Sequence, residues 1–191
     1  MSRVILLTGA TRSGKSRLAV ELAREFGPRI LYVATCRPTD PEMQRRVARH
    51  RQERPASWRT VEASHDPAAA FRQQDNAVDG AILDCLTMHV SKLMMRFSSD
   101  EAVLEHIRLL GEAMRRAPFP VIVVTNEVGG GLVPTNRLGR RFRDLAGWAN
   151  QLIAESADEV YLVVAGLSLC LKPQEPFHAT RHSRRVAVRS R

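Results

Sequence analysis

A phosphate-binding motif lies near the amino-terminus of the chain. Residues 9–16 read GATRSGKS, which matches the pattern GxxxxGK[ST]. Glycines at these places let the backbone turn so that several N–H groups point into one anion-sized nest at a helix N-terminus. In such a loop Lys15 reaches the β- and γ-phosphates of a nucleotide, and the Ser16 hydroxyl binds Mg²⁺. The motif therefore predicts a nucleoside triphosphate site formed by Gly9, Ala10, Thr11, Arg12, Ser13, Gly14, Lys15 and Ser16.

A histidine in a strongly basic segment is the second candidate for chemistry. Residues 45–54 read RRVARHRQER, which places five arginines around His50. Neighbouring positive charges disfavour the protonated imidazole and so keep a nitrogen lone pair available. A neutral imidazole among guanidinium groups suits nucleophilic attack on an anionic substrate. The same segment also fits an ordinary solvated helix face.

Two acidic residues follow apolar runs and complete the set of candidates. Asp84 ends the run AILD, where it fits the carboxylate that accompanies Mg²⁺ in phosphate-loop NTPases. A helix N-cap is the alternative role for Asp84, and the two roles are compatible. Glu127 lies in TNEVGGG, residues 125–131, where it could orient a substrate hydroxyl or form a structural ion pair.

The elements that must position these residues are strands and helices in alternation. Continuous apolar runs predict strands covered on both faces at 4–8, 30–34, 81–84, 121–125 and 160–164, with a possible short strand at 58–62. Helix-length segments occupy 15–26, 40–54, 66–76, 86–97, 100–117 and 135–157. This order predicts an α/β fold of the P-loop NTPase-like (RecA-like) kind, with a mostly parallel sheet flanked by helices. Ligands of such sheets bind beyond the carboxyl ends of the strands.

Length and composition indicate one domain with a basic tail. Residues 1–172 are long enough for a single core, whereas residues 173–191 contain five arginines and one acid, a composition that predicts disorder. The net charge of +9 favours anionic partners. Three cysteines without metal-binding spacing fit a reducing cytoplasm, and no apolar run is long enough to span a bilayer. We therefore expect a cytoplasmic protein without a transmembrane segment.

Two other functions are compatible with a phosphate loop in a basic chain. A nucleic-acid-dependent ATPase would use the basic tail, but only two Trp and two Tyr are available to stack on bases. A non-catalytic nucleotide-binding subunit would not need Lys15, Ser16, Asp84 and His50 together.

Several separated stretches together resemble one family, the bifunctional adenosylcobinamide kinase/adenosylcobinamide-phosphate guanylyltransferases of cobalamin biosynthesis. They run in family order and cover nearly everything before the tail. The longest carry the patterns HRxxRPxxW and TNEVGxGxVPxNRxxRxFRDxxGxxNQ. The stretches are GATRSGKS (9–16), LYVATC (31–36), PEMQRRVARHRQERPASWRTVE (41–62), ILDCLT (82–87), VTNEVGGGLVPTNRLGRRFRDLAGWANQ (124–151) and ADEVYLVVAGL (157–167).

The resemblance implies two reactions at one nucleotide site. ATP or GTP phosphorylates adenosylcobinamide, a corrinoid, and GTP then donates GMP to that phosphate through a guanylylated histidine, which gives adenosylcobinamide-GDP. The histidine that matches is His50, although some relatives carry a second histidine at the position of Arg49. The resemblance also implies a homotrimer and further nucleotide contacts from Thr35, Cys36, Arg37, Arg54, Pro55 and Glu62. Asp84 joins the nucleotide-binding set through the Mg²⁺ cofactor that it and Ser16 are expected to hold.

Overall fold

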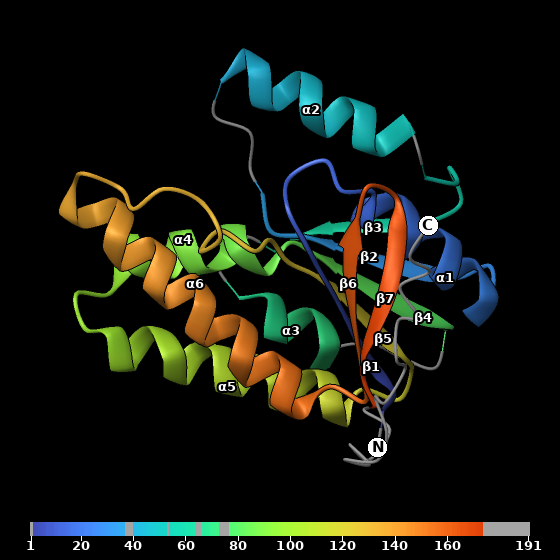
Figure 1. Ribbon diagram of the computed structural model, residues 1–191. Coiled ribbons are helices and arrows are strands. Elements are labelled where there is room, and N and C mark those ends of the chain that lie inside the picture. The colour runs from blue at the N-terminus through green and yellow to red at the C-terminus, as the bar shows by residue number, and fades with distance from the viewer. Residues whose placement is uncertain (1, 37–39, 53, 64–65, 73–76, 174–191) are drawn as a thin grey trace, which may run out of the picture.

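A seven-stranded sheet between two layers of helices forms the core of the protein. The computed structural model describes residues 2–36, 40–52, 54–63, 66–72 and 77–173. The strands follow the order β3-β2-β4-β5-β1-β6-β7, and helices cover both faces (Figure 1). Every neighbouring pair is parallel except β6 and β7, which are antiparallel. The predicted α/β fold with a mostly parallel sheet is confirmed.

The strands and helices lie close to the predicted ranges. The strands are β1 (Val4–Thr8), β2 (Ile30–Ala34), β3 (Arg59–Glu62), β4 (Gly80–Asp84), β5 (Val121–Val124), β6 (Glu159–Val164) and β7 (Leu167–Lys172). The helices are α1 (Lys15–Phe26), α2 (Pro41–Gln52), α3 (Pro67–Arg72), α4 (Leu86–Arg96), α5 (Asp100–Arg116) and α6 (Arg137–Ser156). Asp40 and Ser99 act as N-caps, because their side chains accept hydrogen bonds from the amides of Met43 and Ala102 at 2.8 and 3.3 Å.

The continuous apolar runs of the central strands reflect burial on both faces. On one face Ile5, Leu7 and Ile82 pack with α1. On the other, residues one position along, such as Leu6 and Leu83, pack under α3, α4, α5 and α6. Because neighbouring side chains of a strand point to opposite faces, a strand covered on both sides has no polar face to show in its sequence.

The edge strand β7 was not expected from the sequence. The sequence predicts one strand at 160–164, whereas the structure has a hairpin of β6 and β7 here. Ala165 and Gly166 form the turn with φ angles of 52° and 81°, the left-handed backbone that two-residue hairpin turns of this kind require. The dipeptide Ala-Gly is not one of the strong hairpin signals Asn-Gly and Asp-Gly, so the sequence does not predict this turn. Residues 174–191, most of the basic tail, lie outside the described residues.

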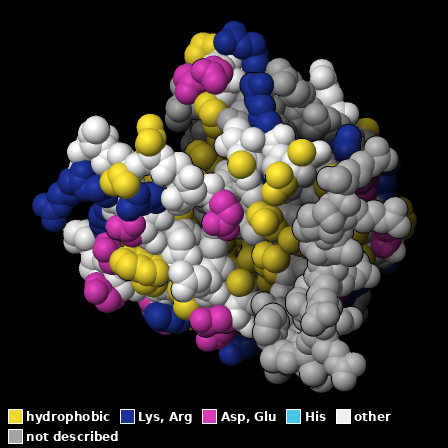
Figure 2. All heavy atoms as spheres, in the orientation of Figure 1, with side chains coloured by type: hydrophobic (Ala, Val, Ile, Leu, Met, Phe, Trp, Pro, Cys, Tyr) yellow, Lys and Arg dark blue, Asp and Glu magenta, His cyan; other side chains and the backbone are white. Residues whose placement is uncertain are grey.

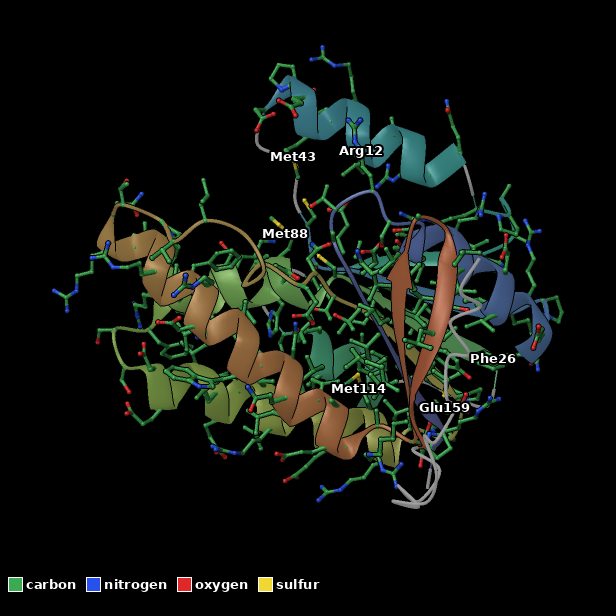
Figure 3. All side chains as sticks on the ribbon, in the orientation of Figure 1. Arg12, Phe26, Met43, Met88, Met114 and Glu159 are labelled. Atoms are coloured by element: carbon green, nitrogen blue, oxygen red, sulfur yellow. The ribbon has the colours of Figure 1, made fainter. Side chains whose placement is uncertain are left out.

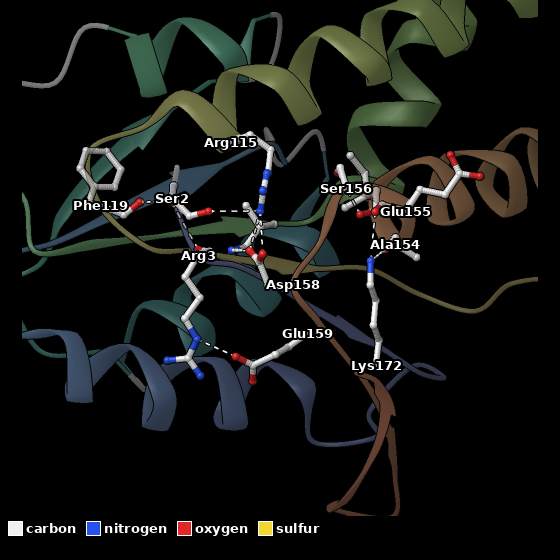
Figure 4. A network of polar contacts seen from close by, with 12 residues as sticks. Ser2, Arg3, Arg115, Phe119, Ala154, Glu155, Ser156, Asp158, Glu159 and Lys172 are labelled. Carbon is white, nitrogen blue, oxygen red and sulfur yellow. Dashed lines mark hydrogen bonds and ion pairs between the residues drawn. The ribbon is translucent and has the colours of Figure 1, made fainter. Parts of the chain in front are cut away.

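Ion pairs join the amino-terminal ends of β1 and β6 to each other and to the end of α5 (Figure 4). Arg3 Nε lies 2.6 Å from Glu159 Oε1, and Arg115 Nη1 lies 2.7 Å from Asp158 Oδ2. Asp158 also accepts a hydrogen bond from the amide of Val4 at 2.7 Å. In Figure 3, Glu159 lies at this end of the sheet and Arg12 at the opposite end. The ion pairs that fasten these strand ends are therefore separate from the edge that carries the candidate site.

Helix α2 stands apart from the rest of the molecule. Figure 1 shows it beyond the carboxyl edge of the sheet, on the side of the loop between β1 and α1. None of its described side chains is buried. One ion pair joins it to the sheet, from Arg51 Nη2 to Glu62 Oε1 of β3 at 3.1 Å. In the described part of the chain, no helix is long and apolar enough to cross a membrane.

His89 on α4 is a buried titratable group away from this edge. Only 3% of its surface is exposed, and its Nδ1 has no hydrogen-bond partner among the described residues. Burial, together with the charges of the nearby His106 and Lys92, lowers the pKa of His89 to about 4. His89 is therefore neutral in the folded protein at neutral pH.

The free energy of unfolding will fall between pH 6.5 and about 4, partly because of His89. The unfolded chain takes up a proton near pH 6.5, whereas the folded protein keeps this imidazole neutral down to about pH 4. Protons thus favour the unfolded state, and the loss approaches ~3 kcal/mol below pH 4. Urea unfolding at several pH values should show a shallower decline for His89→Leu than for the wild type. Parallel declines for the two proteins would contradict this assignment.

Candidate active site

The phosphate loop joins the end of β1 to the start of α1, and Lys15 lies inside its curve. Lys15 is only 5% exposed. Its Nζ donates hydrogen bonds to the carbonyl oxygens of Gly9 at 2.8 Å and Ala10 at 2.7 Å, and it lies 3.4 Å from Ser13 Oγ. The backbone of the loop therefore holds the ammonium group at the N-terminus of α1, where partial positive charge favours anions.

Two glycines of the loop are required by the neighbouring β6–β7 hairpin. Gly9 has a φ of +149°, and a Cβ at this position would lie 2.2 Å from the carbonyl oxygen of Val163. Gly14 has a φ of +103° and caps α1, with its Cβ position 3.1 Å from Gly166 Cα. The amide of Gly166 donates to the carbonyl of Ser13 at 2.8 Å. The hairpin thus supports the loop from behind.

The remaining loop residues differ in exposure. Ala10, Thr11 and Arg12 are exposed at the tip, whereas Ser13 is buried and Ser16 is half-buried in the first turn of α1. Arg12 adopts a φ of 60° and points out of the loop, away from the sheet (Figure 3).

Asp84 ends β4 at the same edge of the sheet. Its Oδ2 accepts a hydrogen bond from the hydroxyl of Tyr32, which lies on the neighbouring strand β2. Burial and the charge of Asp84 raise the pKa of Tyr32 well above its usual value, so this hydroxyl keeps its proton and remains a donor. Cys85, not Asp84, is the residue at the N-cap position of α4, and it makes no side-chain cap. The N-cap alternative for Asp84 is therefore wrong.

Arg54 connects the basic segment to Asp84 through Tyr32. Its guanidinium carbon lies 3.2 Å from the centroid of the Tyr32 ring, which is the geometry of a cation–π contact. Pro55 follows, and its carbonyl accepts from the amide of the buried Trp58 at 3.1 Å. The segment that leads from α2 into β3 is thus packed against β2 beside the carboxylate.

Thr35 lies at the carboxyl edge of the sheet, but its side chain contacts the backbone of Cys85. It is fully buried, and its Oγ1 donates to the carbonyl of Cys85 at 2.7 Å and accepts from the amide of Cys85 at 2.8 Å. Lys92 Nζ donates to the Thr35 carbonyl at 2.5 Å. These contacts hold the chain that follows Asp84, so Thr35 acts on the site through that backbone.

The other predicted contacts lie around α2 or outside the described residues. Cys36 is half-buried after β2, and Glu62 is exposed at the end of β3, where it pairs with Arg51. His50 belongs to α2, but its side chain lies outside the description, as does the whole of Arg37. Arg51 and Arg54, which both follow His50 in the chain, contact β3 and β2.

A polar network that the sequence did not predict lies behind the loop, between β1 and β5. Thr8 Oγ1 donates to Glu127 Oε1 at 2.5 Å, and Asn150 Nδ2 donates to the same oxygen at 3.0 Å. Thr125 Oγ1 donates to Asn150 Oδ1 at 2.7 Å and lies 3.2 Å from Thr87 Oγ1. In the sequence, the polar residues of this network appear only as the TNE segment after β5 and as Asn150 near the end of the longest family pattern. Neither pattern indicates that Glu127 and Asn150 lie in contact.

The donor set at this edge suits a hard cation together with a nucleotide. Hydroxyl and carboxylate oxygens are the ligands that Mg²⁺ prefers, and the ion usually takes further oxygens from phosphates and water. Ser16 and Asp84 supply these groups on either side of β5. Among the described residues, no cluster of three or more His, Cys, Asp or Glu side chains could hold a metal alone. The site therefore fits a metal that arrives with a nucleotide.

Comparison with known proteins identifies the family. Residues 5–171 match the family model described as cobinamide kinase / cobinamide phosphate guanyltransferase, CobU. The chain belongs to this family. It is 40% identical over 181 residues to the bifunctional adenosylcobalamin biosynthesis protein CobU of Salmonella typhimurium, which covers 88% of this chain and 99% of the relative. It is 43% identical over 167 residues to CobP of Pseudomonas aeruginosa, described in the same words, covering 87% of this chain and 96% of the relative.

A solved structure supports the RecA-like fold of this CobU family member. A KaiC-like protein from Pyrococcus horikoshii OT3 superposes with a TM-score of 0.50, covering 84% of this chain and 70% of that one. The sequences are 16% identical, so this likeness concerns the fold alone.

Proposed function

We propose that the protein phosphorylates adenosylcobinamide with a nucleoside triphosphate and then transfers GMP from GTP to the product, adenosylcobinamide phosphate. The observation that carries this proposal is the family match over residues 5–171, together with a complete phosphate loop whose Lys15 lies inside the loop. A nucleic-acid-dependent ATPase or a non-catalytic subunit would not explain the match. We expect a cytoplasmic enzyme without a nucleic-acid partner.

In the kinase reaction the loop would hold the phosphates of ATP or GTP. The backbone amides of residues 9–14 and the N-terminus of α1 attract the phosphate oxygens, and Lys15 neutralises charge that develops on the β- and γ-phosphates. Ser16 and Asp84 would hold Mg²⁺, which supplies further charge neutralisation when it is bound. The hydroxyl of the corrinoid side chain forms a bond to the γ-phosphorus, and the nucleoside diphosphate leaves.

In the guanylyltransferase reaction His50 would act as the nucleophile. An imidazole nitrogen attacks the α-phosphorus of GTP, a P–N bond forms, and pyrophosphate leaves with the electrons of the broken P–O bond. A phosphate oxygen of adenosylcobinamide phosphate then attacks the same phosphorus and releases the histidine. Support comes from the position of α2 at the carboxyl edge (Figure 1) and from the contacts of Arg51 and Arg54 with β3 and β2.

The nucleotide contacts proposed outside the loop are of two kinds. Cys36, Arg37, Arg54, Pro55 and Glu62 belong to the segments around α2 and would meet the nucleoside moiety of GTP. Thr35 would support the site by holding the backbone after Asp84, as its hydrogen bonds to Cys85 suggest.

One experiment tests the proposed function as a whole. The purified protein is incubated with adenosylcobinamide, GTP and Mg²⁺, and the corrinoids are separated and identified by mass spectrometry. We expect adenosylcobinamide phosphate first, followed by adenosylcobinamide-GDP with an equal amount of pyrophosphate. Hydrolysis of the nucleotide that DNA or RNA stimulates, without any corrinoid product, would contradict the proposal.

We also propose that the enzyme is a homotrimer, as the family resemblance implies, and that β7 contributes to the contact. Three leucines alternate along one side of this edge strand, Leu167, Leu169 and Leu171, and they are 76%, 61% and 37% exposed. Hydrophobic side chains gather over β6 and β7 in Figure 2. An exposed apolar edge strand favours burial against another chain.

The Leu169→Lys variant should lose this association. A lysine in the middle of the leucine row places a charge where apolar surface would be buried, and this is costly without a partner charge. Light scattering coupled to size-exclusion chromatography should give a trimer for the wild type and a monomer for the variant. Leu109→Lys, at an exposed leucine of α5, is the matched control and should remain trimeric. A trimeric Leu169→Lys would exclude β7 from the interface.

A further inference from the structure

The carboxylate of Glu127 is held in place from one side only. Its Oε1 accepts hydrogen bonds from Thr8 at 2.5 Å and from Asn150 at 3.0 Å. Oε2 makes no hydrogen bond to a described residue, and Glu127 as a whole is exposed. One oxygen is therefore anchored to the protein, while the other makes no hydrogen bond to a described residue.

The direction of the hydrogen bonds around Glu127 is set by the network behind it. Thr125 donates its hydroxyl proton to Asn150 Oδ1 at 2.7 Å, so the amide of Asn150 presents its NH₂ group to Glu127. The hydroxyl of Thr87, 3.2 Å from that of Thr125, also accepts from the amide of Asn126 at 2.8 Å. Thr87, Thr125 and Asn150 are all buried. Both contacts to Glu127 are therefore donors, and they fix Oε1 as the accepting oxygen.

Glu127 also lies next to the phosphate loop. Its backbone amide donates to the carbonyl of Gly9 at 3.1 Å, and Lys15 Nζ donates to the same carbonyl at 2.8 Å. Thr8, which holds the side chain, is the residue before the loop begins. The carboxylate is thus fixed beside the place where Lys15 would meet the γ-phosphate, just after the strand β5 that separates β1 from β4 and Asp84.

An open loop with apolar side chains follows Glu127. A Cβ at Gly129, Gly130 or Gly131 would project into open space. Leu132 and Val133 are 96% and 61% exposed. These exposed apolar side chains follow Glu127 by a few residues and suit a bulky acceptor with apolar surface.

We propose that Glu127 is the general base of the kinase step, an inference that rests on the function proposed above. Oε2 takes the proton of the acceptor hydroxyl, and the hydroxyl oxygen forms a bond to the γ-phosphorus. The bond from this phosphorus to the bridging oxygen breaks, and its electron pair leaves with the nucleoside diphosphate. The proton then passes from Glu127 to solvent. Thr8 and Asn150 are positioning residues, because they act by holding Oε1.

The two reactions of the enzyme differ in whether they need a base for an acceptor hydroxyl. Phosphorylation removes a proton from a hydroxyl group, whereas attack by a neutral imidazole on GTP removes none from an acceptor hydroxyl. Loss of the carboxylate should therefore impair the kinase reaction and leave self-guanylylation intact. General base catalysis contributes about 10²–10⁴-fold to a rate.

Glu127→Gln is the central test, with Glu112→Gln as the matched control. Glu112 is an exposed glutamate of α5 paired only with Arg116, at 3.2 Å, among the described residues. For each protein, kcat and KM for corrinoid phosphorylation are measured across pH, together with self-guanylylation by GTP labelled in the α-phosphate. For Glu127→Gln we expect kcat to fall at least about 100-fold, the nucleotide KM and self-guanylylation to stay within about 3-fold, and the acid limb of the kcat profile to disappear. Glu112→Gln should match the wild type in every measurement.

Glu127→Asp keeps the charge and protects the test against misfolding of the neutral variant. It should reduce kcat because the shorter side chain withdraws the carboxylate, and it should keep the acid limb that Glu127→Gln loses. A kcat for Glu127→Gln within 10-fold of the wild type would overturn the role of Glu127, as would a parallel fall in self-guanylylation. A wild-type protein that self-guanylylates but never phosphorylates the corrinoid would instead overturn the kinase half of the proposed function, and this role with it.

Discussion

The His50→Ala variant will not become labelled when it is incubated with GTP that carries radioactivity in its α-phosphate. Wild-type protein should take up this label, because the imidazole forms a P–N bond to the α-phosphorus as pyrophosphate leaves. The bond should be labile in acid and stable in base, as expected of a phosphoramidate. The kinase reaction does not need this bond, so phosphorylation of adenosylcobinamide by the variant should remain within a few-fold of the wild type.

Two controls make the loss of label specific. GTP labelled in the γ-phosphate should leave both proteins unlabelled, since the γ-phosphate departs with pyrophosphate. His106→Ala removes a half-buried histidine of α5 whose Nδ1 lies 2.8 Å from the Ala102 carbonyl, and it should be labelled like the wild type. Label that persists in His50→Ala would show that another residue is the nucleophile.

Lys15→Met should lose both reactions. Methionine keeps much of the length of the side chain but removes the charge that lies inside the phosphate loop. We propose that the same loop holds the triphosphate in both steps, and one preorganised charge at such a position contributes on the order of 10²–10³-fold to kcat. Steady-state rates of phosphorylation and of self-guanylylation should fall together by at least this factor, and calorimetry should show weaker binding of GTP.

The matched control for Lys15→Met is Lys172→Met. Lys172 lies at the end of β7, where its Nζ donates to the carbonyls of Ala154 and Glu155 at 3.0 Å each, away from the loop. This variant should keep both activities. If Lys15→Met lost one reaction and kept the other within 10-fold, the two reactions would not share one phosphate site.

The order of the strands explains how one edge can serve two reactions. Strand β5 lies between β1, which leads into the phosphate loop, and β4, which ends in Asp84. Glu127 follows β5 and therefore stands between the ammonium of Lys15 and that carboxylate. On the far side of β4, the ends of β2 and β3 carry the contacts of Arg54 and Arg51 with the segments around α2. Proton acceptance and guanylyl transfer are thus assigned to different places along the same edge.

Much of the fold could be predicted because its signals are local. The phosphate loop is one continuous motif, and strands buried on both faces appear as unbroken apolar runs. The family patterns extend over nearly the whole described chain, and the match over residues 5–171 confirms the family that they indicate. The sequence by itself therefore determined the fold class, the loop with Lys15 and Ser16, and the family. The hairpin of β6 and β7 could not be predicted from the sequence, because its turn residues, Ala165 and Gly166, do not stand out from the apolar residues beside them.

Only the tertiary structure decided which distant residues meet. Thr8 and Glu127 are 119 positions apart, and their hydrogen bond exists because β1 and β5 are neighbours in the sheet. Tyr32 meets Asp84 because β2 pairs with β4, and Thr35 turns toward Cys85 for the same reason. Local patterns record the propensity and burial of each segment, but they carry no information on which strands pair. The partners of Asp84, Thr35 and Glu127 therefore followed from the strand order.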